Sequence, residues 1–284
     1  MINGVRTWRW LSAAAAVVGL AACRNLVDPD LPPNAEEFVP PPVYARWWAM
    51  TEACSGLSGD LSSVSWYMVP GARTVLLNGT PVEGYWSFAG NRIVMAGAGR
   101  LVGGLVRHEM LHALRKARGH SREKFLDDCG GVVACTEACV RDAGPPPSPD
   151  PAAIQVGPEL MEVQVDVEPA TPNLAVDDGF FAVIVSVRNP TTYPVVVRLP
   201  PQPIGGAPTS FSFDWIGQST VMSGHEFALD AGVSVFAVGE TKRQVFDFKI
   251  GNDLASRALP AGTYTLRGGY GGHLETHAPV VLLP

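Results

Sequence analysis

The sequence has no long run of basic residues and no hydrophobic run long enough to cross a membrane as a helix. The net charge is −6 at pH 7 and the pI is about 5.5, so the chain offers no strongly cationic surface that would neutralise nucleic-acid phosphates. The strongest hydrophobic stretch, Leu11–Ala22, is shorter than the about 20 residues that a spanning helix needs. These absences argue against nucleic-acid binding and exclude a protein with several membrane-spanning helices. The hydrophobic fraction of 46% and the charged fraction of 17% are typical of a globular chain rather than a disordered one.

The first 23 residues have the pattern of an export signal. Arg6 and Arg9 precede a short hydrophobic core, Leu11–Leu20, and small residues separate that core from Cys23. The run Leu20–Cys23, with sequence LAAC, resembles the lipobox of bacterial lipoproteins. The resemblance implies removal of residues 1–22 as a signal peptide and acylation of Cys23. The alternative is an ordinary signal peptide in which this cysteine is incidental.

Acylation would anchor the mature chain to a membrane surface. Two or more acyl chains give a stable anchor, whereas a single chain binds only marginally. Residues 1–22 contain two arginines and no acids, so the formal charge of the mature chain becomes −8. Arg24, rather than an aspartate, follows Cys23, and in a bacterium with two membranes this favours the outer membrane of the cell envelope.

Two proline-rich segments divide the mature chain. Residues 23–43 predict an extended tether, and residues 143–154 predict a linker between two domains. The linker separates a first domain, residues 44–142, from a second domain, residues 155–284, and both are long enough to form a hydrophobic core. We expect the two domains to fold independently of each other.

The second domain alternates hydrophobic and polar residues in the way that is typical of half-buried strands. Met161–Val167 shows this period of two residues most clearly. Further short hydrophobic segments are separated by turns rich in Gly, Pro and Asn: Phe181–Val187, Val195–Leu199, Val233–Val238, Val245–Ile250 and Thr263–Arg267. Strands of this length and spacing predict an antiparallel, all-β sandwich.

Three segments of the second domain resemble the bacillary intracellular proteinase inhibitor domain. They are Val187–Thr191, with sequence VRNPT, Phe211–Asp214, with sequence FSFD, and Leu259–Thr265, with sequence LPAGTYT. The resemblance extends over most of residues 160–284 and implies an immunoglobulin-like sandwich. It does not imply inhibition of a proteinase, because other secreted sandwiches use the same turn sequences.

The first domain mixes predicted helices and strands, which indicates an α+β fold. Val43–Ala53 and Leu101–Arg118 have helical patterns. Val64–Val69 and Arg92–Ala96 are predicted strands, and we place Arg92–Ala96 at the edge of its sheet.

The helix Leu101–Arg118 carries the sequence HEMLH, which predicts a metal site. His108 and His112 are four residues apart, so they lie one above the other on one helix face, where they can bind one tetrahedral Zn²⁺ ion. Glu109 lies about 100° further round the helix axis, where it can reach a metal-bound water without binding the metal. Glu109 is therefore the candidate general base. The alternative is a helix with two surface histidines.

The HExxH pattern resembles that of the zincin metallopeptidases. The resemblance implies a zinc ion, hydrolysis of peptide bonds, and a glutamate that takes a proton from water and passes it to the leaving amine. The run His112–Ser121 also resembles the metzincin motif with two additional residues. It departs from that motif at Arg115, where metzincins have a glycine, and at Arg118, where they have the third histidine. No clear Met-turn follows.

The third metal ligand has several candidates, of which we favour His120. A helix that continued to Arg118 would end about 9 Å beyond His112, so the chain would have to turn back. A left-handed conformation at Gly119 would allow this turn, as would a helix that ends near Leu114. A carboxylate on the next segment is the alternative, and the candidates are Glu123, Asp127 and Asp128.

Four cysteines in the first domain predict two disulfide bonds. They are Cys54, Cys129, Cys135 and Cys139, an even number in a chain that carries an export signal. Three pairings exist, and we favour Cys54–Cys129 together with Cys135–Cys139. The first bond would close a long loop and contribute about 4–5 kcal/mol through loop entropy. A zinc site built from the cysteines is the alternative, although none of the spacings is C-x-x-C.

Together these features predict a lipid-anchored zinc metallopeptidase with an α+β zincin-like domain followed by an immunoglobulin-like sandwich. Its substrate would be a peptide or a protein, and Tyr67 and Tyr85 are candidates for stabilising the oxyanion. The alternative is a surface-anchored binding protein with a catalytically silent zincin-like domain and a sandwich that binds a partner. The presence of Glu109 favours the enzyme.

Overall fold

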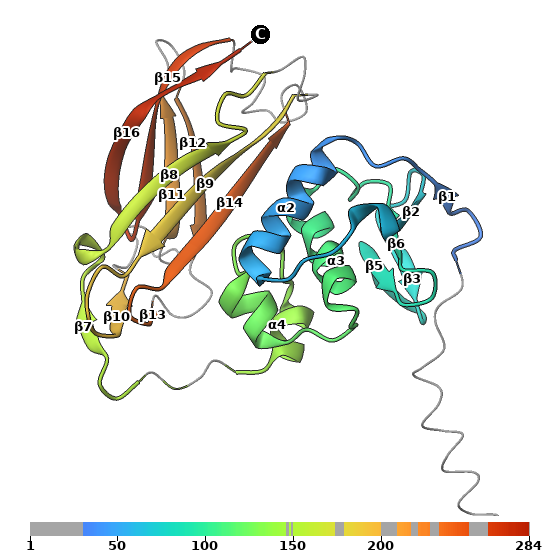
Figure 1. Ribbon diagram of the computed structural model, residues 1–284, viewed down its shortest axis with the longest axis horizontal. Coiled ribbons are helices and arrows are strands. Elements are labelled where there is room, and N and C mark those ends of the chain that lie inside the picture. The colour runs from blue at the N-terminus through green and yellow to red at the C-terminus, as the bar shows by residue number, and fades with distance from the viewer. Residues whose placement is uncertain are drawn as a thin grey trace, which may run out of the picture.

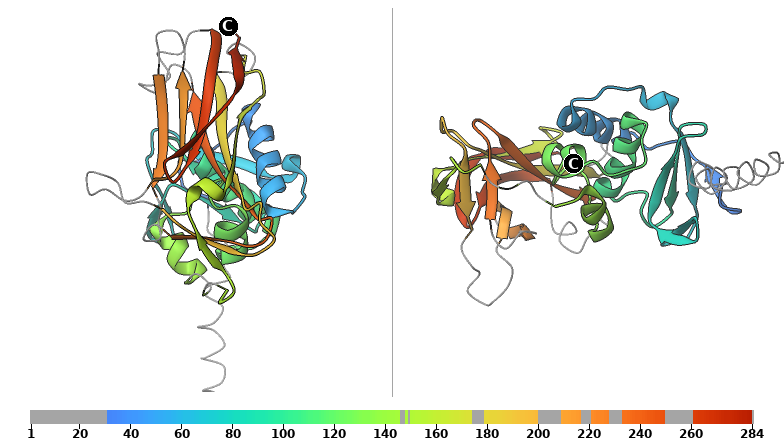
Figure 2. Two further views of the ribbon diagram at one scale, coloured as in Figure 1. Left: turned by 90° about the vertical axis from the view of Figure 1, so that its left-hand side faces the viewer. Right: turned by 90° about the horizontal axis from the view of Figure 1, so that it is seen from below.

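The computed structural model describes residues 31–145, 148, 150–173, 179–199, 209–216, 221–227, 233–249 and 261–283. The predicted signal peptide, Cys23 and the start of the tether lie outside these residues. The described chain has a mixed α+β fold in which sheets predominate (Figure 1). The helices lie between a small sheet and a larger β-structure (Figures 1 and 2). None of the described helices is both long and hydrophobic enough to cross a membrane.

The small sheet contains four strands: β1 (Glu36–Glu37), β2 (Ser65–Val69), β5 (Gly84–Ser87) and β6 (Arg92–Ala96). Their order is β1-β2-β6-β5, with β6 parallel to β2 and antiparallel to β5. The prediction that β6 lies at the sheet edge is therefore wrong, and β5 is the end strand. The residues from Ile93 to Ala96 are all buried, which is the pattern of a strand covered on both faces.

A separate hairpin lies between β2 and β5 in the sequence. It consists of β3 (Val75–Leu77) and β4 (Thr80–Val82), which pair in an antiparallel direction. Asn78 and Gly79 connect the two strands with φ angles of 51° and 83°. Two-residue hairpin turns require positive φ at these positions, which asparagine and glycine tolerate best.

Two helices pack against the small sheet. They are α2 (Val43–Ser55) and α3 (Gly103–Arg115), which agree in position with the two predicted helices. Their shared core is built from large buried side chains: Tyr44, Trp47, Trp66, Trp86 and Met110. The core therefore fixes α3, which carries the HEMLH sequence, against β5 and β6.

Two disulfide bonds hold the chain that follows α3. This part contains η3 (Glu123–Asp128), which is a π-helix, and α4 (Glu137–Ala143). Cys54–Cys129 joins α2 to the residue after η3, and Cys135–Cys139 closes a short loop at the start of α4. Both favoured pairings are present, so a zinc site built from four free cysteines is ruled out.

The second part of the chain is all β. Its strands are β7 (Ile154–Val156), β8 (Glu162–Glu168), β9 (Phe180–Arg188), β10 (Val195–Arg198), β11 (Thr209–Ile216), β12 (Val221–Phe227), β13 (Val233–Phe236), β14 (Thr241–Lys249), β15 (Gly262–Tyr270) and β16 (His273–Leu282). They form sheets of order β14-β9-β8, β12-β11-β15-β16 and β13-β10-β7. The first two share a core that includes Val165, Val183, Phe213, Trp215 and Leu266. The predicted segments correspond to β8, β9, β10, β13, β14 and β15, whereas β7, β11, β12 and β16 were not predicted.

This β-structure packs directly against the helices of the first part. Arg107 on α3 donates two hydrogen bonds to the carboxylate of Asp247 on β14, at 2.8 and 2.7 Å. The backbone N–H of Val245 donates to the carbonyl of Gly131 at 2.8 Å. The side chain of Arg107 is only 1% exposed, so its charge is neutralised inside the interface. From the proline-rich linker we expected two domains that fold independently, and this interface between the two parts was not predicted.

Candidate metal centre

Three histidine side chains converge on one point beside α3. The Nε2 atoms of His108 and His112 are 3.3 Å apart, and that of His120 lies 3.1 Å from the first and 3.3 Å from the second. A tetrahedral zinc ion with Zn–N bonds of about 2.0–2.1 Å keeps its ligand nitrogens about 3.3 Å apart. The three separations therefore agree with those between nitrogens that share one tetrahedral ion.

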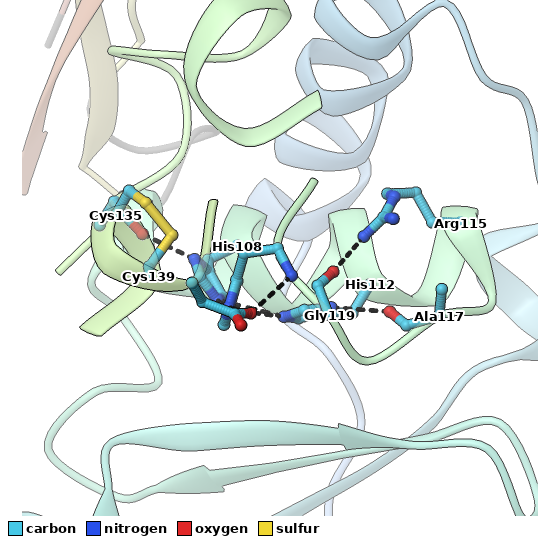
Figure 3. Close-up of polar contacts among 10 residues, drawn as sticks. His108, His112, Arg115, Ala117, Gly119, Cys135 and Cys139 are labelled. Carbon is cyan, nitrogen blue, oxygen red and sulfur yellow. Dashed lines mark hydrogen bonds and ion pairs between the residues drawn. A yellow bond between two sulfur atoms is a disulfide. The ribbon is translucent and has the colours of Figure 1, made fainter. Parts of the chain in front are cut away.

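Backbone carbonyl groups hold the other ring nitrogen of the two helical histidines. Nδ1 of His108 donates to the carbonyl of Ala134 at 2.7 Å, and Nδ1 of His112 donates to that of Ala117 at 2.8 Å (Figure 3). A carbonyl oxygen only accepts hydrogen bonds, so Nδ1 carries the proton and Nε2 keeps its lone pair. Burial lowers the pKa of His108 to about 4 and holds the pKa of His112 well below its usual range. Both rings are therefore neutral at pH 7.

His120 is oriented by a carboxylate on α4. Asp142 accepts a hydrogen bond from Nδ1 of His120 at 2.9 Å and another from its backbone N–H at 3.0 Å. These hydrogen bonds hold the pKa of the Asp142 carboxyl below its usual range, so it is ionised at pH 7. A carboxylate in this position fixes the ring and raises the basicity of its other nitrogen. Sequence reasoning missed Asp142, because it lies on α4, 22 residues after His120.

The three nitrogens form a donor set that needs a cation. Each Nε2 atom of His108, His112 and His120 presents a lone pair to the other two across 3.1–3.3 Å. Lone pairs this close repel one another unless a positive charge lies between them. A neutral set of imidazole nitrogens suits a borderline ion such as zinc. The residues therefore fit a bound metal ion.

The end of α3 brings His120 back towards the helix. Lys116 takes the left-handed conformation with φ of 52°, and its backbone N–H donates to the carbonyl of His112. A left-handed residue here ends the helix and redirects the chain. The expected turn at Gly119 is absent, because this glycine has no positive φ; its carbonyl instead accepts a hydrogen bond from Arg115 (Figure 3). The helix accordingly ends earlier than predicted.

The alternative carboxylate ligands lie in other interactions. Lys124 pairs with Glu123 at 3.1 Å and with Asp128 at 2.5 Å, while Arg122 pairs with Asp127 at 3.4 Å. Among the described residues, none of these acids joins the group of ligand atoms around the histidines. The structure therefore brings together the three predicted histidines and leaves the three carboxylates out.

A buried phenylalanine packs against all three histidine rings. The centroid of the Phe125 ring lies 4.9 Å from that of His108, 4.8 Å from that of His112 and 4.9 Å from that of His120. Phe125 is fully buried and belongs to η3, a π-helix, a form often found at functional sites. Its ring excludes water from one side of the cluster and limits rotation of the imidazoles. No spacing in the sequence pointed to this residue.

Glu109 is buried between α3 and β5. Its side chain is 4% exposed, and it accepts a hydrogen bond from the backbone of Trp86 on β5. Burial raises the pKa of Glu109 to about 8, and the hydrogen bond opposes this rise. A cation bound by His108 and His112 would favour the carboxylate and lower this pKa. Glu109 is therefore placed to ionise near neutral pH, which suits a general base.

The two candidate tyrosines lie on the other face of the small sheet. Trp66 and Trp86 pack with α2 and α3, and side chains alternate between the two faces of a strand. Tyr67 and Tyr85 accordingly pack with Val75 and its neighbours at the β3–β4 hairpin. The structure therefore does not support either tyrosine as an oxyanion-stabilising residue.

The Cys135–Cys139 disulfide lies beside the histidine cluster (Figure 3). The Sγ atom of Cys139 is within 4.8 Å of a ring nitrogen of His108 and of His120, so these three residues are a second combination that could hold a metal ion. Because this sulfur is bonded to Cys135, it offers no thiolate. In the disulfide-bonded chain the three histidines are therefore the better donor set.

A cavity of about 810 Å³ lies elsewhere, between α2 and the sheet β14-β9-β8. Met50, Ile184, Arg188 and Arg243 are among its lining residues. Neither the three histidines nor Glu109 contributes to its wall, so it is separate from the metal centre.

The comparisons with known proteins identify no family for this chain. No family model and no curated protein matches it. Among solved structures, 44% of the chain is similar to 31% of a DNA-bound alkylpurine DNA glycosylase, AlkC, from Pseudomonas fluorescens, with 11% identity and a TM-score of 0.28. A second similarity covers 43% of this chain and 15% of the β-glucosidase EmGH1 from Erythrobacter marinus, with 15% identity and a TM-score of 0.27. A third similarity covers 44% of this chain and 92% of the putative ApaA protein from Bordetella pertussis, with 17% identity and a TM-score of 0.24. Similarities this weak carry no argument about the fold or the function.

Proposed function

We propose that this chain is a zinc-dependent peptidase in which residues 44–142 form a zincin-like domain and residues 155–284 form an immunoglobulin-like sandwich. The observation that carries this proposal is the convergence of three histidine Nε2 atoms 3.1–3.3 Å apart, with Glu109 beside the first histidine on the same helix. Structural zinc sites have four protein ligands, whereas catalytic sites have three and keep a position open. The histidine set supplies three.

Each residue of the site has a defined task in the proposed reaction. A zinc ion bound by the three histidines would supply the Lewis acidity that activates a water molecule and polarises the carbonyl of the peptide bond to be cleaved. Glu109 takes a proton from that water and delivers it to the nitrogen of the leaving amine. The hydrogen bond from Trp86 fixes the direction of the Glu109 carboxylate. Asp142 and Phe125 hold the imidazole rings in place.

Substitution of Glu109 separates metal binding from catalysis. Glu109→Gln keeps the size of the side chain but removes the base, so the protein should retain stoichiometric zinc while hydrolysis falls by a factor of about 10² or more. His112→Ala removes a ligand, so zinc content and hydrolysis should fall together. Zinc is measured by atomic emission, and hydrolysis of a peptide library is measured by mass spectrometry of the products.

Glu123→Gln is the matched control for this experiment. Glu123 is an exposed glutamate that pairs with Lys124 and has no contact with the histidine nitrogens. This variant should keep both its zinc and its activity. The peptidase proposal fails if Glu109→Gln hydrolyses peptides as fast as the wild type, or if the wild type binds no stoichiometric metal. A binding role without catalysis would then replace it.

The proposed peptidase is anchored by lipid at Cys23. The support for this part of the proposal is the LAAC sequence after a short hydrophobic core. Cys23→Ala should release the protein from membranes or block its processing, as measured by cell fractionation and the mass of the mature chain. Normal cleavage and continued membrane association of the variant would contradict the anchor.

A further inference from the structure

The Cys135–Cys139 disulfide connects the two segments that orient the histidines. Cys135 directly follows Ala134, whose carbonyl accepts the hydrogen bond from His108. Cys139 lies on α4 three residues before Asp142, so these two side chains share one face of the helix. Asp142 accepts the hydrogen bond from His120. One covalent bond therefore ties together the supports of two of the three metal-binding rings.

The two sulfurs of this disulfide have different surroundings. Cys139 is 2% exposed, and its Sγ lies within 4.8 Å of a ring nitrogen of His108 and of His120. Cys135 is only partly buried, so we take its sulfur, rather than that of Cys139, as the one that an external thiol attacks. In thiol–disulfide exchange the attacked sulfur forms a mixed disulfide and the other sulfur leaves as a thiolate. Attack at Cys135 therefore releases a thiolate on Cys139, beside the histidines.

We propose that this disulfide is a redox gate in which the released Cys139 thiolate becomes the fourth metal ligand and closes the site. The inference rests on the proposed metal centre at His108, His112 and His120. A thiolate is a strong zinc ligand, and a set of three histidines and one cysteine resembles a closed structural site rather than an open catalytic one. Reduction would therefore tighten metal binding and stop hydrolysis, and reoxidation would return metal affinity and hydrolysis to their original values.

The redox step balances with a dithiol as the reductant. The dithiol gives two electrons and becomes a disulfide, while Cys135 and Cys139 each gain one electron and become thiols. The Cys135 thiol keeps its proton. Cys139 gives its proton to solvent when it binds the metal, because the thiolate is the form that ligates. The second disulfide, Cys54–Cys129, takes no part in the proposed ligation, because among the described residues neither of its sulfurs belongs to the group of possible ligand atoms at His108 and His120.

Two serine variants test the gate, since both lack the disulfide and differ only in the thiol that remains. Cys135→Ser leaves Cys139 free, and Cys139→Ser leaves Cys135 free. The probe is Co²⁺ added to the metal-free full chain, because a thiolate ligand gives a near-ultraviolet charge-transfer absorption that histidine ligands do not give. We expect this absorption in Cys135→Ser, with at least tenfold tighter Co²⁺ binding and at least 10²-fold slower hydrolysis. Cys139→Ser, which lacks the same disulfide, should lack the absorption, bind Co²⁺ less tightly than Cys135→Ser and hydrolyse peptides faster than Cys135→Ser.

The wild type separates failure of the gate from failure of the metal centre. Oxidised wild type should bind Co²⁺ without the thiolate absorption and gain that absorption when a dithiol is added. If Cys135→Ser and Cys139→Ser give the same spectrum, or if both lose Co²⁺ alike, the disulfide is only structural and the gate is wrong. If oxidised wild type binds no stoichiometric Co²⁺, the proposed metal centre itself fails.

Discussion

Removal of the buried carboxyl of Glu109 should change how the stability of the metal-free protein depends on pH. The side chain is 4% exposed, and burial raises its pKa from 4.5 to about 8. The folded protein therefore holds a proton on Glu109 at pH values at which the unfolded chain has lost it. Glu109→Gln keeps the shape of the side chain but removes this titration.

The size of the effect follows from the two pKa values. A raised pKa gives stability that is fully present below pH 4.5 and is lost as the pH rises through about 8. At 1.36 kcal/mol for each pKa unit, the ionisable group lowers the free energy of unfolding by about 1 kcal/mol at pH 5 and about 4 kcal/mol at pH 8. Relative to Glu109→Gln, the wild type should therefore lose about 3 kcal/mol between these two pH values.

Urea unfolding of both proteins in the presence of a chelator measures this difference. His108 and His112 titrate in both proteins, so their contributions cancel when the two pH profiles are subtracted. The two profiles should lie close together at pH 5 and diverge by pH 8, with the variant more stable. Parallel profiles would contradict the prediction, because they would show that burial does not raise the pKa of Glu109. Zinc should reduce the divergence, because a nearby cation stabilises the carboxylate.

Two further substitutions test the carboxylates that hold His120 and α3 in place. Asp142→Asn keeps a hydrogen-bond acceptor for His120 but removes the charge, so zinc affinity should fall about 10–100-fold in a chelator competition, and unchanged affinity would mean that Asp142 does not tune the ligand. Asp247→Asn leaves the guanidinium of Arg107, which is 1% exposed, without its ionic partner, and should lower the free energy of unfolding by about 3–5 kcal/mol in urea. Glu162→Gln removes an exposed ion pair on the same sheet and is the control, with an expected loss below about 1 kcal/mol; equal losses in these two variants would argue against a stabilising interface.

The local parts of the site could be read from the sequence. A helical pattern with histidines four residues apart places both rings on one face whatever surrounds the helix, so His108 and His112 were predictable. The disulfides followed from an even number of cysteines in a chain with a predicted export signal. Strand β8 was predictable because its polar and hydrophobic residues alternate with a period of two.

The parts that were missed depend on contacts between distant segments. Lys116 adopts a left-handed conformation that a lysine does not predict, and this turn decides where His120 lies. Asp142 and Phe125 reach the histidines only because η3 and α4 fold back on α3. Among the strands, β16 carries Pro279 and begins after two glycines, both of which argue against a strand when read locally.

The most direct test of the central claim is anomalous X-ray diffraction from crystals of the zinc-loaded protein at the zinc absorption edge. We expect one strong anomalous peak bonded to the Nε2 atoms of His108, His112 and His120, at about 2.0–2.1 Å from each. Absence of a peak at this point, or a peak coordinated by the carboxylates of Glu123, Asp127 or Asp128 instead of His120, would contradict the claim.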